Sequence, residues 1–270
     1  MYKKIGFIGC GNMAQAMIKG IVKSEKVSPE NIIVSNPSEE KLKNIKRECG
    51  VNVTKDNKKV ALNSDILILS VKPNKYGDVI KEIKEEVSPR AIIVTIAAGI
   101  SIDKVRLFFK SDDVKVIRTM PNTPALVGEA MTALCASDNV HDEEIDLIRE
   151  LFDSFGRTEV IDEKLMDVIT GLSGSSPAYV YMFIEAMADG AVLQGMPREK
   201  AYKIAAQSVL GAAKMVLETK KHPGELKDQV CSPGGTTIEA VYYLEKSNFR
   251  ASIMGAVDKC TEKSKEMAKK

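Results

Sequence analysis

The stretch IGFIGCGNMAQA, residues 5–16, decides the fold. A β-rich run ends at Gly9, and a helical pattern begins after Gly11. Gly9, Gly11 and Ala14 stand in the GxGxxG/A frame, which allows a tight turn, a close backbone approach to a pyrophosphate and close packing of helix on strand. The N-terminus of the helix would face the anion. The stretch therefore predicts the first strand and helix of a dinucleotide-binding domain.

Short β-rich runs alternate with amphipathic segments along the first half of the chain. This alternation is expected for a parallel sheet covered by helices on both faces. The expected strands lie at residues 4–9, 31–35, 65–71, 91–97, 114–120, 130–136 and 157–161. The sequence therefore predicts an α/β fold, with a Rossmann-type, doubly wound parallel sheet in residues 1–162.

After residue 162 the β-rich runs stop, and long segments rich in Ala, Met and Leu follow. We expect an all-α domain in residues 163–270. Residues 179–194 are apolar nearly all round. A helix of this kind is expected to be enclosed by other helices, some of them from a second subunit.

Composition favours a small-molecule substrate. The 270 residues include 39 basic and 37 acidic ones, a net charge of +2, so nothing indicates nucleic-acid binding. The N-terminal apolar run is too short for a signal peptide, and charges interrupt the later apolar segments, so we expect neither secretion nor a membrane span.

The positions of the cysteines and histidines indicate the cellular compartment of the protein and whether it binds a metal ion. The five cysteines are odd in number, scattered and without a CxxC pair, which indicates reduced thiols in the cytoplasm. The two histidines, His141 and His222, do not stand in a metal-ligand spacing, so we expect no metal.

Three further loops follow predicted strands, and ligands of a doubly wound sheet bind beyond the carboxyl ends of its strands. They read SVKPN from Ser70, IAAGIS from Ile96 and RTMPNTPALVG from Arg118. Lys72 could bond the nicotinamide ribose, and the small residues at 97–99 suit a loop beneath a cofactor. The amide of Asn122, between two prolines, could point into the cleft. Each loop could also be a rigid turn, but their shared placement favours binding.

The end of the second strand bears on cofactor choice. Ser35, Asn36 and Ser38 are neutral there, and the first acid, Glu39, lies beyond the position that usually binds the ribose of NAD. NADPH is favoured and NADH stays possible, because no Arg follows Asn36 to bind a 2′-phosphate and Lys41 could only substitute for it. The predicted cofactor residues are Ile8, Gly9, Gly11, Asn12, Met13, Ser35, Asn36, Asn57, Ser70, Val71, Lys72, Pro73, Ala97, Ala98, Gly99 and Asn122.

Several motifs together resemble the pyrroline-5-carboxylate reductase family across nearly the whole chain. They are GFIGCGNMAQAM, SVKP, AAGIS, MPNTP, GLSGSSPAYVY and HPGELKDQVCSPGGTTIEAV. The resemblance implies a Rossmann-type domain and a helical dimerisation domain that interleaves with its partner, often in a ring of dimers. It also implies NAD(P)H-dependent reduction of the cyclic imine 1-pyrroline-5-carboxylate to L-proline, the last step of proline biosynthesis.

The resemblance assigns the substrate to SPGGTT. The imine nitrogen accepts a proton readily, so the site needs to hold the substrate rather than supply a strong acid. Thr237 would bond this nitrogen as the catalytic residue and could relay a proton. Ser232 and the N–H groups of Gly234, Gly235, Thr236 and Thr237 would bind the carboxylate. The alternative is a plain helix cap.

This sequence departs from the family at two positions. Thr236 stands where the family often has Ala, and Lys220 stands where some members have an acid.

Two other functions stay open. A 3-hydroxyacid-type dehydrogenase would need a proton-handling lysine early in the helical half, and residues 171–187 contain none. A non-catalytic NADP-binding regulator could share the fold, because fold alone does not establish activity.

Overall fold

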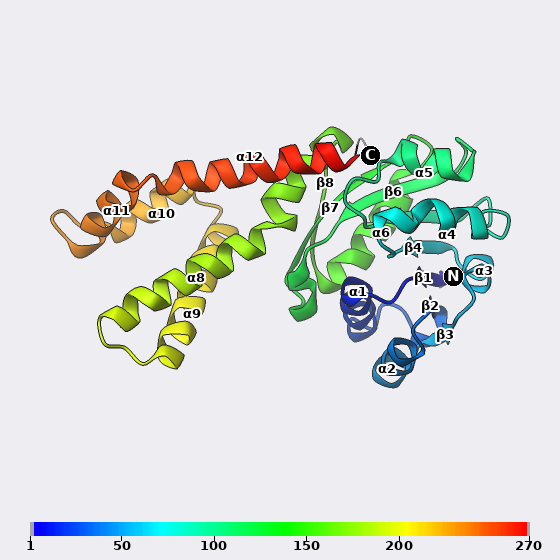
Figure 1. Cartoon of the computed structure of the whole chain (residues 1–270), viewed down its shortest axis with the longest axis horizontal. Helices are drawn as coiled ribbons and strands as arrows, with labels where there is room; N and C mark the ends of the chain where they lie inside the picture. The colour runs from blue at the N-terminus through cyan, green and yellow to red at the C-terminus, as the bar shows by residue number, and fades with distance from the viewer. Residues whose placement is uncertain (1–2, 269–270) are drawn as a thin grey trace. The chain divides into compact units, whose positions relative to one another are not determined.

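The computed structural model describes residues 3–268, which pack as two compact units. The first unit runs to Ser175 and takes in the chain again from Lys259, and the second is Ser176–Asp258. Figure 1 shows the strands in the first unit and helices alone in the second. Residues 163–175 therefore pack with the sheet in the first unit. The predicted boundary after residue 162, between a cofactor-binding and a substrate-binding domain, stays a prediction.

The sheet has eight strands in the order β3-β2-β1-β4-β5-β6-β7-β8. Neighbouring strands are parallel except β6 and β7, which are antiparallel. The α/β prediction is confirmed. The strands are β1 (Ile5–Ile8), β2 (Ile32–Ser35), β3 (Asn52–Thr54), β4 (Ile66–Leu69), β5 (Ile92–Thr95), β6 (Lys115–Met120), β7 (Ala130–Ala136) and β8 (Gly156–Val160).

Two details of the predicted sheet were wrong. The edge strand β3 was missed, because its three residues, NVT, carry too short a pattern to stand out. The reversal of β7 was also missed. Only a 3-10 turn joins β6 to β7, and a connection without a crossover helix returns the chain antiparallel.

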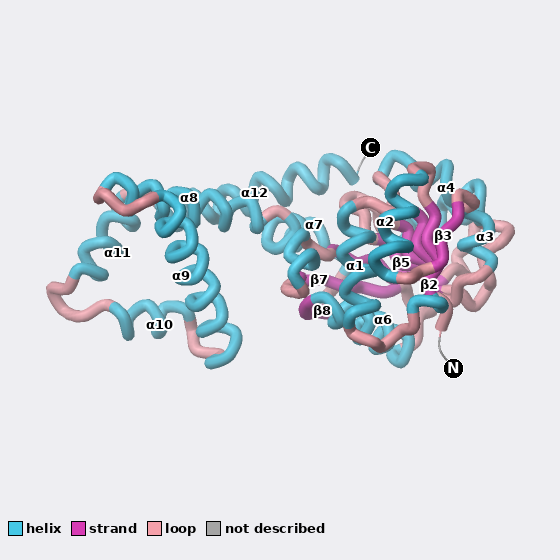
Figure 2. Tube along the Cα trace, turned by 90° about the horizontal axis from the view of Figure 1, so that it is seen from below, coloured by secondary structure: helices cyan, strands magenta, loops and turns pink. Residues whose placement is uncertain are grey.

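Helices cover both faces of the sheet, as the tube in Figure 2 shows. Side chains of successive strand residues alternate between two buried clusters, with Ile66 and Ile68 in one and Leu67 and Leu69 in the other. The first cluster includes residues of α1 (Asn12–Lys23), α2 (Glu39–Cys49) and α6 (Asp142–Phe152). The second includes residues of α3 (Asn57–Leu62), α4 (Tyr76–Ile83) and α5 (Ile102–Phe109).

The remaining elements are short turns and the helices of the second half. The short elements are η1 (Pro29–Asn31), η2 (Pro73–Lys75), η3 (Thr123–Val127), η4 (Asp153–Phe155), η5 (Glu163–Leu165), α7 (Met166–Ile169) and the π-helical turn η6 (Thr170–Gly174). The long helices are α8 (Ser176–Leu193), α9 (Arg198–Thr219), α10 (Pro223–Val230), α11 (Thr236–Lys246) and α12 (Phe249–Ala268). The helical second half is thus confirmed.

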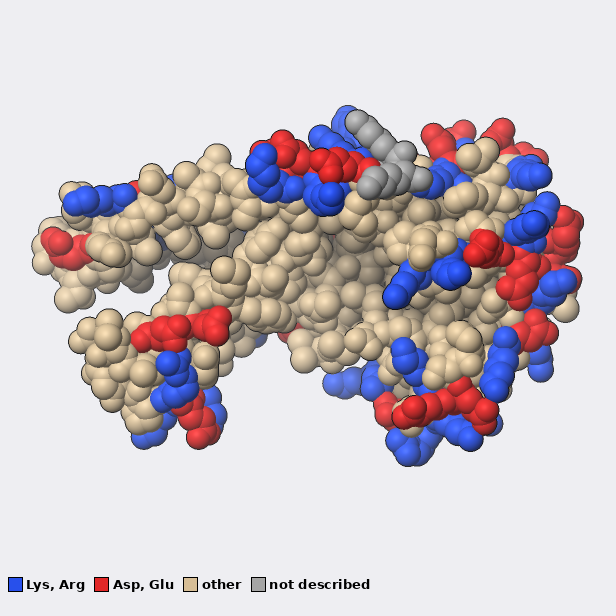
Figure 3. Space-filling view, viewed as in Figure 1, with Lys and Arg blue, Asp and Glu red and all other residues tan. Residues whose placement is uncertain are grey.

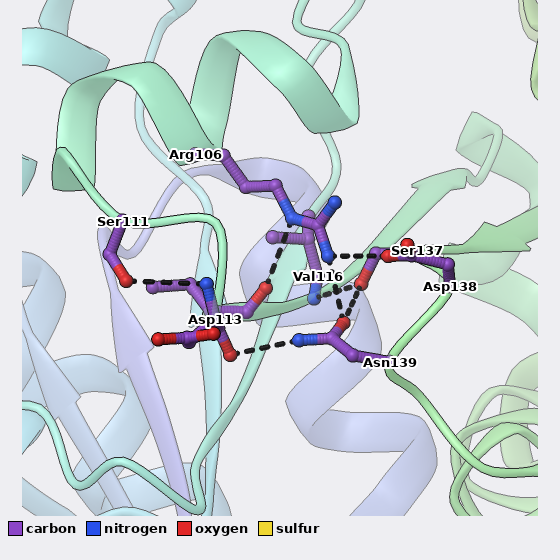
Figure 4. A network of polar contacts seen from close by, with 8 residues as sticks. Arg106, Ser111, Asp113, Val116, Ser137, Asp138 and Asn139 are labelled. Atoms are coloured by element: carbon purple, nitrogen blue, oxygen red, sulfur yellow. Dashed lines mark hydrogen bonds and ion pairs between the residues drawn. The ribbon is translucent and has the colours of Figure 1, made fainter.

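A polar network fixes the start of β6 against the end of β7 (Figure 4). Arg106 Nη2 donates to Asp138 Oδ1 at 2.7 Å and to Asn139 Oδ1 at 3.0 Å. Ser137 Oγ accepts from the N–H of Val116 at 3.0 Å and donates to Asn139 Oδ1 at 2.7 Å. The network joins α5 to the turn that follows β7, which holds the antiparallel strand in register.

Glu144 on α6 makes a second tie to β6. Lys115 Nζ lies 2.7 and 2.8 Å from its two carboxylate oxygens, and the N–H of His141 donates to Oε2 at 3.0 Å. Burial alone would raise the pKa of Glu144, but the hydrogen bonds from Lys115 and His141 outweigh it and lower this pKa. The carboxylate is thus favoured in the folded state.

Glu144→Gln is expected to lower the free energy of unfolding by about 1–2 kcal/mol at pH 7, because it removes charge-assisted hydrogen bonds. The folded-state pKa is depressed, so this stabilisation is present above the unfolded pKa and lost as pH falls below it, near 4.5. Urea unfolding at pH 7 and pH 3 measures the difference. Glu143→Gln, at an exposed neighbour in the same helical turn, is the control. An equal loss at both pH values would contradict the assignment.

The helix α8 exposes much of its apolar surface in the single chain. Of its eighteen residues only Ala188 is buried, while Tyr181 is 61% and Met182 69% exposed. On the visible face of the second unit in Figure 3, uncharged surface lies between separate groups of charged residues. Exposed apolar area on this scale is typical of an interface with another protein. Within residues 3–268, no helix is both long and apolar enough to cross a membrane.

The last turns of α12 belong to the first unit. Ser264 Oγ lies 2.6 Å from Asp167 Oδ1 in α7, and Cys260 Sγ lies 3.2 Å from Ser175 Oγ. Thr261 and Ser264 are buried there. The last turns of α12 thus cover α7 and the turn that follows it.

Candidate active site

The glycine loop after β1 is clamped by its neighbours. Gly9 has φ +104°, and a Cβ there would lie 2.6 Å from the carbonyl oxygen of Ser70. Ser70 Oγ donates to the carbonyl oxygens of Ile8 and Gly9 at 3.0 and 2.9 Å, and the N–H of Gly9 donates to Ser35 O at 2.9 Å. Only glycine fits this turn between the ends of β2 and β4.

The N-terminus of α1 is open to a ligand. Gly11 is its N-cap residue and makes no side-chain cap, and a Cβ on Gly11 would meet nothing within 4 Å. Asn12 is exposed, Met13 is partly buried and Ala14 is buried against the sheet. The first N–H groups of the helix lack intrahelical partners, so the loop fits the pyrophosphate of a dinucleotide.

The polar residues Ser35 and Asn36 at the end of β2 are already paired within the protein. Ser35 is fully buried, and its Oγ donates to Asn57 Oδ1 at 2.7 Å. Asn57 Nδ2 donates in turn to Glu82 Oε2 at 2.9 Å. Asn36 Oδ1 accepts from the N–H of Cys10 at 3.1 Å. The side chains of Ser35 and Asn36 therefore brace the loops instead of standing free.

A buried tyrosine fixes the loops after β4 and β5. Tyr76 Oη donates to the carbonyl oxygen of Leu69 at 2.6 Å and lies 2.8 Å from Thr95 Oγ1. Burial raises the pKa of Tyr76, so its hydroxyl stays protonated. Lys72, which directly precedes η2, is exposed, and Gly99 has φ +73°.

The amide of Asn122 is engaged within the protein. Its Oδ1 accepts from the N–H of Met131 at 2.9 Å, and its Nδ2 donates to Ser173 O in η6 at 3.0 Å. This corrects the expectation that the amide is free to point into the cleft. Asn122 ties the loop after β6 to the π-helical turn, and π-helical turns are frequent at functional sites.

The structure brings all the predicted cofactor residues to one edge of the sheet, because they end or follow the parallel strands β1 to β6 at their carboxyl ends. Gly9 to Met13 follow β1, and Val71 and Pro73 flank Lys72 after β4. Ala97 and Ala98 precede Gly99 after β5.

In the second unit, the SPGG sequence forms a tight turn between α10 and α11. The N–H of Gly235 donates to Ser232 O at 3.0 Å, and Gly234 has φ +67°. A proline followed by a left-handed glycine and this closing bond are typical of a type II turn. A Cβ on Gly235 would lie 2.4 Å from Ser232 Oγ, so glycine leaves room for that hydroxyl.

The turn presents the uncapped N-terminus of α11. Gly235 is the N-cap residue, and no side chain caps the helix. Thr236 is exposed and Thr237 is partly buried in the first turn. The N–H of Gly235 closes the turn and is not free, which corrects the expectation for that group. The uncapped N–H groups of this turn and the hydroxyls of Ser232 and Thr237 can donate hydrogen bonds to a small carboxylate.

Three residues of the site region were missed from the sequence. Tyr76 and Glu82 lie on α4, and Lys55 follows β3, which itself was not predicted. Of these, only Lys55 could have been found earlier, had the edge strand been recognised. Across residues 3–268, no group of three or more His, Cys, Asp or Glu side chains is placed to hold a metal ion.

Comparison with known proteins matches both halves of the chain to described families. Residues 163–267 match "Pyrroline-5-carboxylate reductase dimerisation", and residues 4–99 match "NADP oxidoreductase coenzyme F420-dependent". Pyrroline-5-carboxylate reductase from Escherichia coli (strain K12) is 49% identical over 269 residues, covering 100% of each chain.

Solved structures are similar over the same length. The NADP-bound pyrroline carboxylate reductase of Plasmodium falciparum has a TM-score of 0.89 at 34% identity, covering 98% of each chain. Pyrroline-5-carboxylate reductase from Coxiella burnetii has a TM-score of 0.93 at 33% identity, covering 99% of each chain.

Proposed function

The chain belongs to the pyrroline-5-carboxylate reductase family, and we propose which of its residues bind and activate the substrate. It is an NAD(P)H-dependent oxidoreductase that reduces 1-pyrroline-5-carboxylate to L-proline, the last step of proline biosynthesis. The main support for the substrate site is the N-terminus of α11, which follows the turn from Ser232 to Gly235 and has no side-chain cap.

The first unit would hold the cofactor. The open N-terminus of α1 and the clamped glycine loop would receive the pyrophosphate, because N–H groups there have no protein partner. Lys72 and the loop 97–99 would contact the nicotinamide end. When bound, the reduced nicotinamide supplies the hydride.

The second unit would hold the substrate carboxylate and ring nitrogen. The hydroxyl of Ser232 and the N–H of Thr236 would bind the carboxylate at the positive end of the helix dipole. Thr237 Oγ1 would accept a hydrogen bond from the protonated ring nitrogen. This bond orients the C=N group and favours the charged imine, which is the better hydride acceptor. No acid within the turn is then required.

The dimerisation match and the exposed apolar faces of α8 support a homodimer. Residues 163–270 would serve as the dimerisation and substrate-binding domain, and dimers would assemble further into a ring. We place the enzyme in the cytoplasm, because its five cysteines form no disulfide and lie scattered in the sequence.

The initial rate of NADPH oxidation with racemic pyrroline-5-carboxylate, measured beside NADH, tests the function. Turnover that depends on the imine is expected. Tight NADPH binding without turnover would instead favour the regulator, and turnover of a 3-hydroxyacid with NADP⁺ would favour the dehydrogenase.

A further inference from the structure

Lys55 lies at the sheet edge where the adenosine ribose of a dinucleotide binds. Strands β2 and β3 are parallel, with Ser35 in register with Thr54. Lys55 therefore follows β3 at the same level at which Asn36 follows β2. In doubly wound folds the residue at the end of the second strand meets the ribose 2′ position. Lys55 is thus the nearest cation that the neighbouring strand provides to this position.

Two of the neutral residues at the end of β2, Ser35 and Asn36, have little donor capacity left. The buried Ser35 hydroxyl donates its hydrogen bond to Asn57 Oδ1. The Asn36 side chain accepts a hydrogen bond from the N–H of Cys10 and donates one to the carbonyl oxygen of Ser38 at 3.4 Å. A phosphate at the 2′ position would need a charged partner, because it carries most of its charge at neutral pH. Selection for the phosphate therefore falls to a residue outside β2.

Glu39, the first residue of α2, forms an ion pair with Lys55. Lys55 Nζ lies 2.9 Å from Glu39 Oε2, and Lys43 Nζ lies 2.9 Å from Glu39 Oε1. Hydrogen bonds from Lys43 and Lys55 lower the pKa of Glu39 to about 2, so the carboxylate stays charged. All three side chains are more than half exposed, so the ion pairs are exchangeable.

We propose that Lys55 selects the adenosine 2′-phosphate and that Glu39 competes with that phosphate for Lys55. The inference rests on the proposed function, since it requires a dinucleotide at the end of β2. The Lys55 ammonium exchanges the Glu39 carboxylate for the phosphate when the phosphate binds. Lys43, one helical turn further along α2, keeps its own ion pair with the other carboxylate oxygen of Glu39.

Binding of two fragments to the full-length protein isolates the 2′-phosphate. Isothermal titration calorimetry with adenosine 2′,5′-bisphosphate and with 5′-AMP gives their ratio of dissociation constants. Lys55→Gln is expected to reduce the preference for the bisphosphate about tenfold or more, since it removes a charge-assisted contact. Lys55→Arg should keep the preference. Glu39→Gln should strengthen bisphosphate binding severalfold and leave 5′-AMP unchanged.

Lys43→Gln is the matched control, because it removes an equal charge from the same carboxylate. It should change the preference less than about twofold, as its contact is with Glu39. A wild-type preference that survives in Lys55→Gln, or that falls equally in Lys43→Gln, would overturn the inference. So would weaker bisphosphate binding by Glu39→Gln. If the wild-type protein bound neither NADPH nor NADH, the proposed function itself would fail.

Discussion

Thr237→Ala is expected to lower kcat/KM for pyrroline-5-carboxylate about a hundredfold or more while NADPH binding is unchanged. The hydroxyl sits in the first turn of α11, where it would bond the ring nitrogen whose charge decides the reactivity of the imine. Removal of one such group at a reacting centre typically costs factors of this size. Steady-state rates over a range of imine concentrations, beside an NADPH titration, measure both effects.

Two further variants distinguish the loss of the Thr237 hydroxyl from a disturbance of the turn that precedes α11. Thr236→Ala leaves the assigned N–H in place and should change kcat/KM only a few-fold. Thr237→Ser keeps a hydroxyl and should retain most of the activity. Equal losses in Thr236→Ala and Thr237→Ala would mean that both act by disturbing the Ser232 turn, and the role given to Thr237 would be wrong.

Gly9→Ala is expected to weaken NADPH binding about a hundredfold or more and to lower the free energy of unfolding by about 2–4 kcal/mol. A Cβ would lie 2.6 Å from the carbonyl oxygen of Ser70, a backbone atom that cannot rotate away, and φ is +104°. The loop must shift to relieve the contact, which moves the N–H groups that would face the pyrophosphate. NADPH fluorescence titration and urea unfolding measure the two losses.

Gly11→Ala is the matched comparison. Its φ of −76° suits alanine, and the added Cβ would meet no protein atom within 4 Å. The variant should unfold like the wild type and yet bind NADPH more weakly, because the methyl group would stand where the cofactor approaches. Normal NADPH binding by Gly9→Ala would refute the assignment of this loop.

The sequence predicted the elements that carry strong local patterns. Runs such as ILIL in β4 are buried on both faces, and the GCGN turn specifies its own geometry, so both can be read from neighbouring residues. The edge strand β3 has only three residues, and its formation depends on pairing with β2. That pairing joins residues about twenty positions apart, which no local pattern shows.

The placement of the predicted cofactor residues at one edge of the sheet was correct, whereas their roles in binding stay predictions. Ser35, Asn36 and Asn122 do lie at the carboxyl edge of the sheet. Their hydrogen-bond partners, however, are Asn57, Cys10, Met131 and Ser173, and a tertiary partner cannot be read from the sequence around a residue. Residue type thus predicted which loops face this edge of the sheet, but did not show which side-chain groups have no partner within the protein.

The return of α12 to the first unit has a consequence for the order of folding during synthesis. The contact between Asp167 and Ser264 joins residues 97 positions apart, across the whole of the second unit. When α7 leaves the ribosome, the helix that covers it has not yet been translated. The sheet and its helices can assemble early, but the first unit can be completed only after α12 has been translated and has left the ribosome, by which time the helical unit has emerged as an insertion within it.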